Sequence, residues 1–138
     1  MDTTTKNQQS KDSLSWNDSL MIGIPEIDKQ HKILLVLFDE LISLSKEEDN
    51  SDKILTLLKE LQRYSIYHFN SEEEIMHREN LPNLELQIEQ HNLFKKRIAE
   101  FMIGQNYKNR VLLNQISIFL RKWIIVHISD IDTKTLKH

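Results

Sequence analysis

The sequence predicts an all-α protein, an antiparallel up-down-up-down four-helix bundle with an extended N-terminal arm. The 138 residues include only two glycines and two prolines, whereas leucine, isoleucine, glutamate and lysine are plentiful. This composition favours long helices with few turns. Apolar residues recur at steps of three and four in four separate segments, which is the period of an amphipathic helix. Because the connections between these segments are short, we expect neighbouring helices to run in opposite directions.

Length and composition also exclude several classes of protein. A chain of 138 residues corresponds to one domain with one core. The net charge of −3, without a basic stripe, gives no reason to expect a nucleic-acid partner. The absence of cysteine rules out disulfides, thiolate metal ligands and a cysteine nucleophile. No apolar run is long enough to span a bilayer, and the N-terminus lacks the apolar core of a signal peptide, so we expect a cytoplasmic protein without membrane contact.

We divide the chain into a flexible polar tail, residues 1–13, and a helical domain, residues 14–138. The tail has no apolar period that could be buried. Residues 16–25 form an apolar arm in which Gly23 and Pro25 act as helix breakers, so we expect the arm to extend across the bundle.

Four helices follow the arm. The first is expected from about Ile27 to the polar cluster at 46–51, and the second ends near Glu79. Asn80-Leu81-Pro82-Asn83 then breaks the chain, and a turn at 104–109 separates the third helix from the fourth. The expected buried faces are, in order, Ile27, His31, Leu34, Phe38 and Leu41; Ile54, Leu58, Leu61, Ser65, His68 and Glu72; Leu84, Ile88, His91, Phe94, Ile98 and Phe101; and Leu112, Ile116, Leu120, Trp123 and His127.

Each of these four faces carries one histidine, namely His31, His68, His91 or His127. Glu72 lies one turn after the second histidine, and Asp132 lies five residues beyond the fourth. A single histidine on an apolar face is usually a hydrogen-bonded core residue. Four imidazoles and two carboxylates in one core, however, would require pairing or neutralisation. A metal centre resolves the difficulty, because imidazole and carboxylate are good ligands and the cation compensates the buried charge.

The types of ligand restrict the metal. Imidazole and carboxylate without sulfur suit iron, manganese or zinc better than copper(I) or calcium. Two carboxylates able to bridge, together with several histidines, are enough for two metal ions that share the carboxylates. We therefore favour a dimetal centre.

The motifs that carry these residues also resemble a known family. In chain order they are Trp16; Ile27-Asp28-Lys29-Gln30-His31; HFNSEEEIM, beginning at His68; His91 before Phe94; and Trp123-Ile124-Ile125-Val126-His127-Ile128 with Asp132. This order resembles the hemerythrins, above all the bacterial single-domain form, bacteriohemerythrin, and covers about residues 16–132. The resemblance implies a four-helix bundle with two non-heme iron ions, oxo- or hydroxo-bridged, that binds dioxygen reversibly.

The resemblance also implies a role for each ligand. His31 and His68 would bind the iron that receives dioxygen, and His91 and His127 would bind the other iron. Glu72 and Asp132 would be the two bridging carboxylates.

One position departs from the family pattern. The family has a further histidine ligand four residues before His91, where this chain has Gln87. Its amide oxygen could bind the iron, it could hold a water at an exchangeable position, or the centre could lose that iron. We favour an intact di-iron centre with glutamine or water at this position. His77 lies nine residues after His68 and faces the opposite side of its helix, so we expect a surface residue, as for His138.

Several residues near the motifs are expected to surround the site. A dry apolar pocket is expected to be lined by Leu34, Phe38, Ile75 and Trp123, and the two tryptophans are expected to shield the site from water. Glu73 and Glu74 are expected on a solvated face. Candidates for orienting the ligands are Gln30, Tyr64 and Tyr67.

Three functions follow from this pattern. The first is reversible dioxygen binding for storage, delivery or sensing, in which sensing would require a separate redox or signalling protein as partner. The second is a di-iron oxidoreductase acting on peroxide or nitric oxide, with an open iron position caused by Gln87. The third is a metal-free bundle that serves only as an interaction module.

Overall fold

The computed structural model describes residues 16, 20–47, 50–103, 106–132 and 136. These residues form four α-helices and one π-helix, with no strand among them, so the predicted all-α class is confirmed. The elements are α2 (Pro25–Ser45), α3 (Ser51–Arg78), α4 (Leu84–Met102), α5 (Arg110–Val126) and the π-helix η2 (His127–Asp132). The predicted tail and His138 lie outside the described residues.

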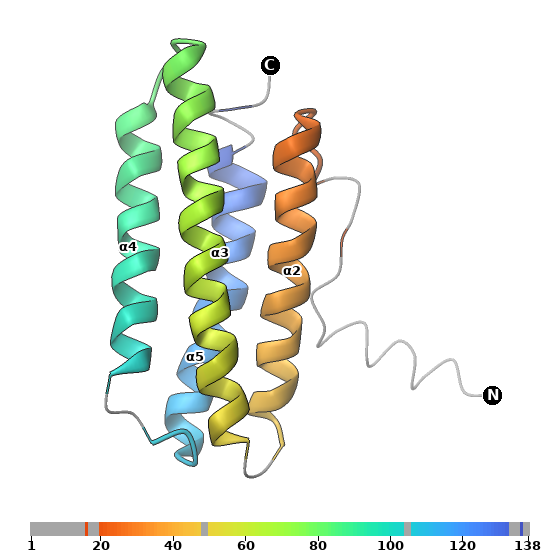
Figure 1. Cartoon of the computed structure of the whole chain (residues 1–138), viewed down its shortest axis with the longest axis vertical. Coiled ribbons are helices and arrows are strands. Elements are labelled where there is room, and N and C mark those ends of the chain that lie inside the picture. The colour runs from red at the N-terminus through yellow and green to blue at the C-terminus, as the bar shows by residue number, and fades with distance from the viewer. Residues whose placement is uncertain (1–15, 17–19, 48–49, 104–105, 133–135, 137–138) are drawn as a thin grey trace, which may run out of the picture.

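The four helices lie side by side in a bundle (Figure 1). In this view α2 and α4 run downwards and α3 and α5 run upwards, so helices that follow one another in sequence point in opposite directions. Helix α2 packs against both α3 and α5, and α3 packs against α4. None of the described helices is long and apolar enough to cross a membrane.

The described part of the arm ends in a turn that is tied to the first turn of α2. Gly23 has φ +90°, a conformation that glycine adopts without strain. The backbone N–H groups of Ile22 and Gly23 donate to the Asp28 carboxylate, at 2.9 and 3.2 Å. Helix α2 begins at Pro25, earlier than the expected Ile27. Proline suits the first helical position because its φ is already helical and the missing N–H would have no helical partner.

The predicted break between the second and third helices is confirmed. Residues 79–83 lie between α3 and α4. Asn80 and Asn83 adopt φ of +51° and +69°, in the left-handed region that asparagine tolerates better than most residues. The two asparagines therefore reverse the chain within a short connection.

The buried apolar residues form two clusters of unequal size. The large core cluster occupies most of the bundle and includes Phe38, Phe69, Phe94, Phe101 and Trp123. The small core cluster consists of Ile22, Ile27, Ile75, Met76 and Leu136. Along α2, His31 lies between residues of the small cluster and those of the large one. A layer of buried polar side chains therefore lies between the two clusters.

The buried face of α4 differs from the expected one at one position. Ile88 is 36% exposed, whereas Gln87 is fully buried. The buried residues Gln87, His91, Phe94, Ile98 and Phe101 keep the steps of four and three that place side chains on one helical face. Ile88 lies one residue off this face, so its assignment to the buried stripe was wrong.

Candidate metal centre

All seven predicted site residues meet in the polar layer, and each is at most 1% exposed. Helix α2 contributes one of them, α3 and α4 contribute two each, and η2 contributes the last two. They are His31; His68 and Glu72; Gln87 and His91; and His127 and Asp132. The hydrophobic period had placed the four histidines and Glu72 on the buried faces of their helices, and the structure brings Gln87 and Asp132 into the same layer.

Glu72 lies at the centre of this layer. Its Oε2 is 3.3 Å from Nε2 of His31 and 3.3 Å from Nε2 of His68. Its Oε1 is 2.9 Å from Nε2 of His91 and 3.3 Å from Nε2 of His127. One carboxylate thus contacts four imidazoles and divides its two oxygens between two pairs of them.

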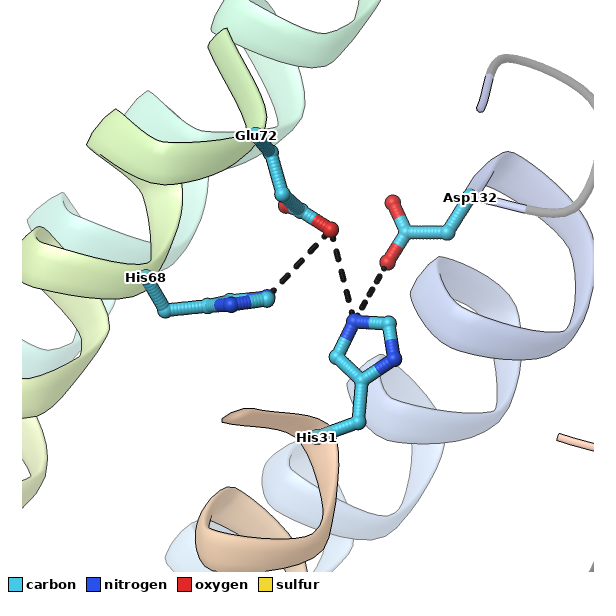
Figure 2. Close-up of side chains that lie close together, drawn as sticks. All are labelled: His31, His68, Glu72 and Asp132. Carbon is cyan, nitrogen blue, oxygen red and sulfur yellow. Dashed lines mark hydrogen bonds and ion pairs between the residues drawn. The ribbon is translucent and has the colours of Figure 1, made fainter. Parts of the chain in front are cut away.

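Asp132 also directs its two carboxylate oxygens to different histidines. Its Oδ2 is 2.9 Å from Nε2 of His31, and its Oδ1 is 3.1 Å from Nε2 of His127. Figure 2 shows His31, His68, Glu72 and Asp132 pointing towards one another. We call His31 and His68, with Glu72 Oε2 and Asp132 Oδ2, the first subsite. The second subsite is His91 and His127 with Glu72 Oε1 and Asp132 Oδ1.

The π-helix explains how Asp132 reaches the layer. In an α-helix, a residue five positions after His127 would point well away from it, because one turn takes 3.6 residues. The wider i→i+5 turn of η2 brings both side chains to the same cluster. The spacing of five residues was visible in the sequence, but the π turn was not anticipated.

In two histidines, the Nδ1 atom, which is the ring nitrogen remote from Glu72, is hydrogen-bonded to another side chain. His68 Nδ1 lies 2.7 Å from Oε1 of Gln30, whose Nε2 donates to Ser71 Oγ at 3.2 Å. His91 Nδ1 donates to Oε2 of Glu73, at 2.7 Å. A partner at Nδ1 fixes the ring orientation and leaves Nε2 to face the cluster.

The outer residues therefore only partly match the expectation. Gln30 contacts His68, which was predicted as a ligand. Glu73 was wrongly assigned to a solvated face, because its side chain is 26% exposed and bound to His91. Glu74 and His77 are exposed, as expected.

Gln87 contributes a hydrogen bond to the same layer. Its Nε2 donates to Oδ1 of Asp132, at 2.6 Å. The amide nitrogen, rather than the amide oxygen, therefore faces the carboxylate oxygen of the second subsite.

Aromatic rings cover the second subsite. Phe69 stacks on His91, with ring centroids 4.0 Å apart, and Trp123 stacks on His127 at 4.2 Å. Phe69 had no assigned role, although its place three residues before Glu72 puts it beside the buried face of α3.

The predicted pocket lining is divided by the polar layer. The large core cluster contains Leu34, Phe38 and Trp123, whereas Ile75 belongs to the small core cluster. These four residues therefore do not line one continuous apolar surface.

The charges in the layer shift the pKa values of its members. Burial opposes protonation of His31 and His127, but Asp132 and Glu72 outweigh it and raise their pKa values to about 9 and about 10. Burial lowers the pKa of His68, against the opposing effect of Glu72. Burial alone would raise the pKa of Glu72, but the surrounding histidines hold it well below its ordinary value.

The donors in this layer fit a metal ion. His68 Nε2 is buried without a hydrogen-bond partner and points at Glu72. The donor atoms of His31, His68, Glu72 and Asp132 lie within 4.8 Å of one another, as do those of Glu72, His91 and His127. Imidazole nitrogens and carboxylate oxygens without sulfur suit iron, manganese or zinc.

Similar proteins carry the same type of domain. A family model described as the hemerythrin HHE cation binding domain matches residues 22–137. A bacteriohemerythrin of Clostridium acetobutylicum is 29% identical over 121 residues, covering 85% of this chain and 94% of that protein. A bacteriohemerythrin of Stenotrophomonas maltophilia is 27% identical over 119 residues, or 86% and 76% of the two chains. A hemerythrin-like protein of Naegleria gruberi is 25% identical over 120 residues, or 87% and 88%.

Proposed function

The chain belongs to the hemerythrin family of non-heme iron-binding proteins, and from this premise we propose that it holds two iron ions and binds dioxygen reversibly. The observation that carries the proposal is the division of both carboxylates. Glu72 and Asp132 each direct one oxygen to the first subsite and the other to the second. This arrangement suits two cations that share bridging carboxylates.

The ligands follow from the two subsites. His31 and His68 would hold one iron, and His91 and His127 would hold the other. Glu72 and Asp132 would bridge them. Gln30 and Glu73 would keep two of the imidazoles turned towards the metals through their hydrogen bonds to Nδ1.

The chain supplies the surroundings that reversible binding needs. Two bound ferrous ions would supply electrons to dioxygen on binding and would recover them on its release. Leu34, Phe38 and Trp123 are buried in the large core cluster, and they would keep bulk water from the centre. Exclusion of bulk water disfavours irreversible oxidation of the metals. Storage, delivery and sensing of dioxygen would all use this step.

A second candidate function is a di-iron oxidoreductase acting on peroxide or nitric oxide. One observation favours it. Gln87 occupies the position where the family resemblance implies a further histidine ligand, and its amide nitrogen faces Asp132. A less crowded second iron would admit an external ligand and favour turnover over reversible binding.

Metal content and the optical spectrum test both candidates. The iron-loaded, reduced protein is exposed to air and then to vacuum. Two irons per chain, with a charge-transfer band that appears with oxygen and fades under vacuum, are the expected result. Two irons that pass directly to a stable diferric spectrum would support the oxidoreductase. One iron per chain would refute the dimetal proposal, and a fully folded protein without metal after iron-replete expression would support an interaction module.

A further inference from the structure

We propose that Gln87 is a hydrogen-bond donor that positions Asp132, and that the second subsite consequently keeps a coordination position for a small anion. The inference rests on the dimetal centre proposed above. It assigns to the second subsite a ligand that no side chain of the polar layer provides. Azide is the probe, because it is a small linear anion that binds ferric iron.

The orientation of the Gln87 amide carries the first step. Its nitrogen donates to Asp132 Oδ1 at 2.6 Å, inside a layer that is closed to solvent. An amide nitrogen has no lone pair to offer a metal, whereas the amide oxygen has two. Turning the amide to direct its oxygen at the second subsite would place two acceptor oxygens against each other. The bond to Asp132 would be lost as well, so this orientation opposes ligation.

The second step compares the number of metal-binding atoms in the two subsites. The first subsite has two imidazole nitrogens and one oxygen from each carboxylate within 4.8 Å of one another. In the second, the two imidazole nitrogens lie that close to an oxygen of Glu72, and Asp132 Oδ1 is 3.1 Å from His127 Nε2. The resemblance implies a third imidazole at position 87 for the second iron only. Without it, the second subsite has no more donors than the first. An iron held by so few protein ligands keeps positions for an external ligand.

The surroundings restrict the size and charge of that ligand. Phe69 and Trp123 stack on the two histidines of the second subsite, and the site residues are buried, so we expect only a small ligand to reach this position. Gln87 itself is uncharged, so no fixed negative charge at that position repels an anion. Small anions such as azide, cyanate or nitrite are therefore the class of ligand that we propose for this position.

Azide titration of the diferric protein tests the proposal. Calorimetry gives the number of azides bound per centre, and the infrared stretch of azide shows whether it is bound to iron. We expect two azides in the unaltered protein and one in Gln87→His, where the added imidazole fills the position. Gln87→Leu should still bind two, because leucine removes the amide without supplying a ligand. One azide in the unaltered protein and two in Gln87→Leu would show that Gln87 ligates the iron and would overturn the proposal.

Stepwise loading of the metal-free protein with Co²⁺ tests the positioning of Asp132. Gln87→Leu should weaken the second of two binding steps by about tenfold, because loss of a partner that orients a ligand costs roughly 10–100-fold in affinity. Equal affinities in the two proteins would overturn the positioning role. Helical circular dichroism identifies any variant that fails to fold, and Gln87→Asn then replaces it, since its shorter amide cannot reach Asp132.

The two proposals fail in different ways. A centre that binds two irons and two azides but is oxidised irreversibly by air refutes dioxygen binding and leaves this inference intact. A centre that binds dioxygen reversibly but takes only one azide, with and without Gln87, refutes this inference alone.

Discussion

His91 of α4 donates its Nδ1 hydrogen to the carboxylate of Glu73 on α3, at 2.7 Å. The next residue before Glu73 is the central carboxylate of the polar layer, so consecutive glutamates contact opposite nitrogens of one imidazole ring. The ring is thereby fixed in position and tautomer, with Nε2 directed at the subsite. We therefore expect Glu73 to influence a bound metal through His91.

Substitution of Glu73 should weaken metal binding. Glu73→Ala removes the acceptor at His91 Nδ1, and we expect metal affinity to fall by about 10–100-fold. Glu73→Gln keeps an acceptor oxygen and should lose less. Competition with a chelator measures the affinity, and Glu74→Ala is the matched control because that neighbour is exposed. Equal affinities for Glu73→Ala and Glu74→Ala would contradict the assigned role.

Metal binding should release protons and become tighter as pH rises. The pKa values of His31 and His127, about 9 and about 10, lie above the ordinary 6.5, so both rings carry protons at pH 7 in the metal-free protein. Metal requires the neutral rings. We expect release of about two protons per loaded centre at pH 7. Above the two raised pKa values, these histidines should no longer make the metal affinity depend on pH.

Calorimetric titration with Zn²⁺ in buffers of different ionisation enthalpy counts these protons. His77→Gln is the control, because His77 is exposed and lies off the buried face of α3, and it should change nothing. An affinity that stays constant between pH 7 and 9 would show that His31 and His127 are neutral in the metal-free protein.

Phe69 should be among the most costly core residues to truncate. It is completely buried and packs against His68, His91, Phe94 and Trp123. Phe69→Ala should lower the free energy of unfolding by about 3–5 kcal/mol, because the cavity adds to the lost transfer free energy. Chemical denaturation of the metal-free protein measures the loss. Phe119→Ala, at a half-buried position, should cost clearly less, and equal losses would contradict the prediction.

Asp28 should control how firmly the arm closes the small core cluster. Its carboxylate accepts the N–H groups of Ile22 and Gly23, and Ile22 belongs to that cluster. In Asp28→Asn one acceptor oxygen becomes an N–H₂ group that faces a donor, which should cost about 1–3 kcal/mol.

Extraction of metal by a chelator provides the readout for the arm. We expect faster extraction from Asp28→Asn, because local opening of the arm exposes the polar layer. Glu26→Gln removes an exposed carboxylate from the same helical turn and should leave the rate unchanged. An unchanged rate in Asp28→Asn as well would mean that metal leaves by another route.

The sequence was sufficient to place the four histidines and Glu72 on buried faces, because the apolar period reports directly which side of each helix is buried. His31, His68, His91 and His127 fell on that side with the core residues around them. Glu72 followed because it lies one turn after His68 on the same face. These inferences need only the geometry of a single helix.

The other contacts of the site depend on how neighbouring helices pack against one another, and the hydrophobic period of a single helix does not encode this packing. Glu73 lies off the buried stripe of α3, and its partner His91 comes from another helix. Gln87 could be placed beside the site, but the direction of its amide depends on Asp132. That residue reaches the layer through a π turn that leaves no mark in the hydrophobic pattern.

The unequal division of the core bears on how the protein matures in the cell. The large core cluster lies to one side of the polar layer and holds most of the buried apolar residues. Burial of apolar surface is the main contribution to folding, and the imidazoles and carboxylates already neutralise one another. We therefore expect the newly synthesised chain to fold before it binds iron. Metal insertion would then be a late step in biogenesis, with the folded metal-free protein as the species that binds the metal.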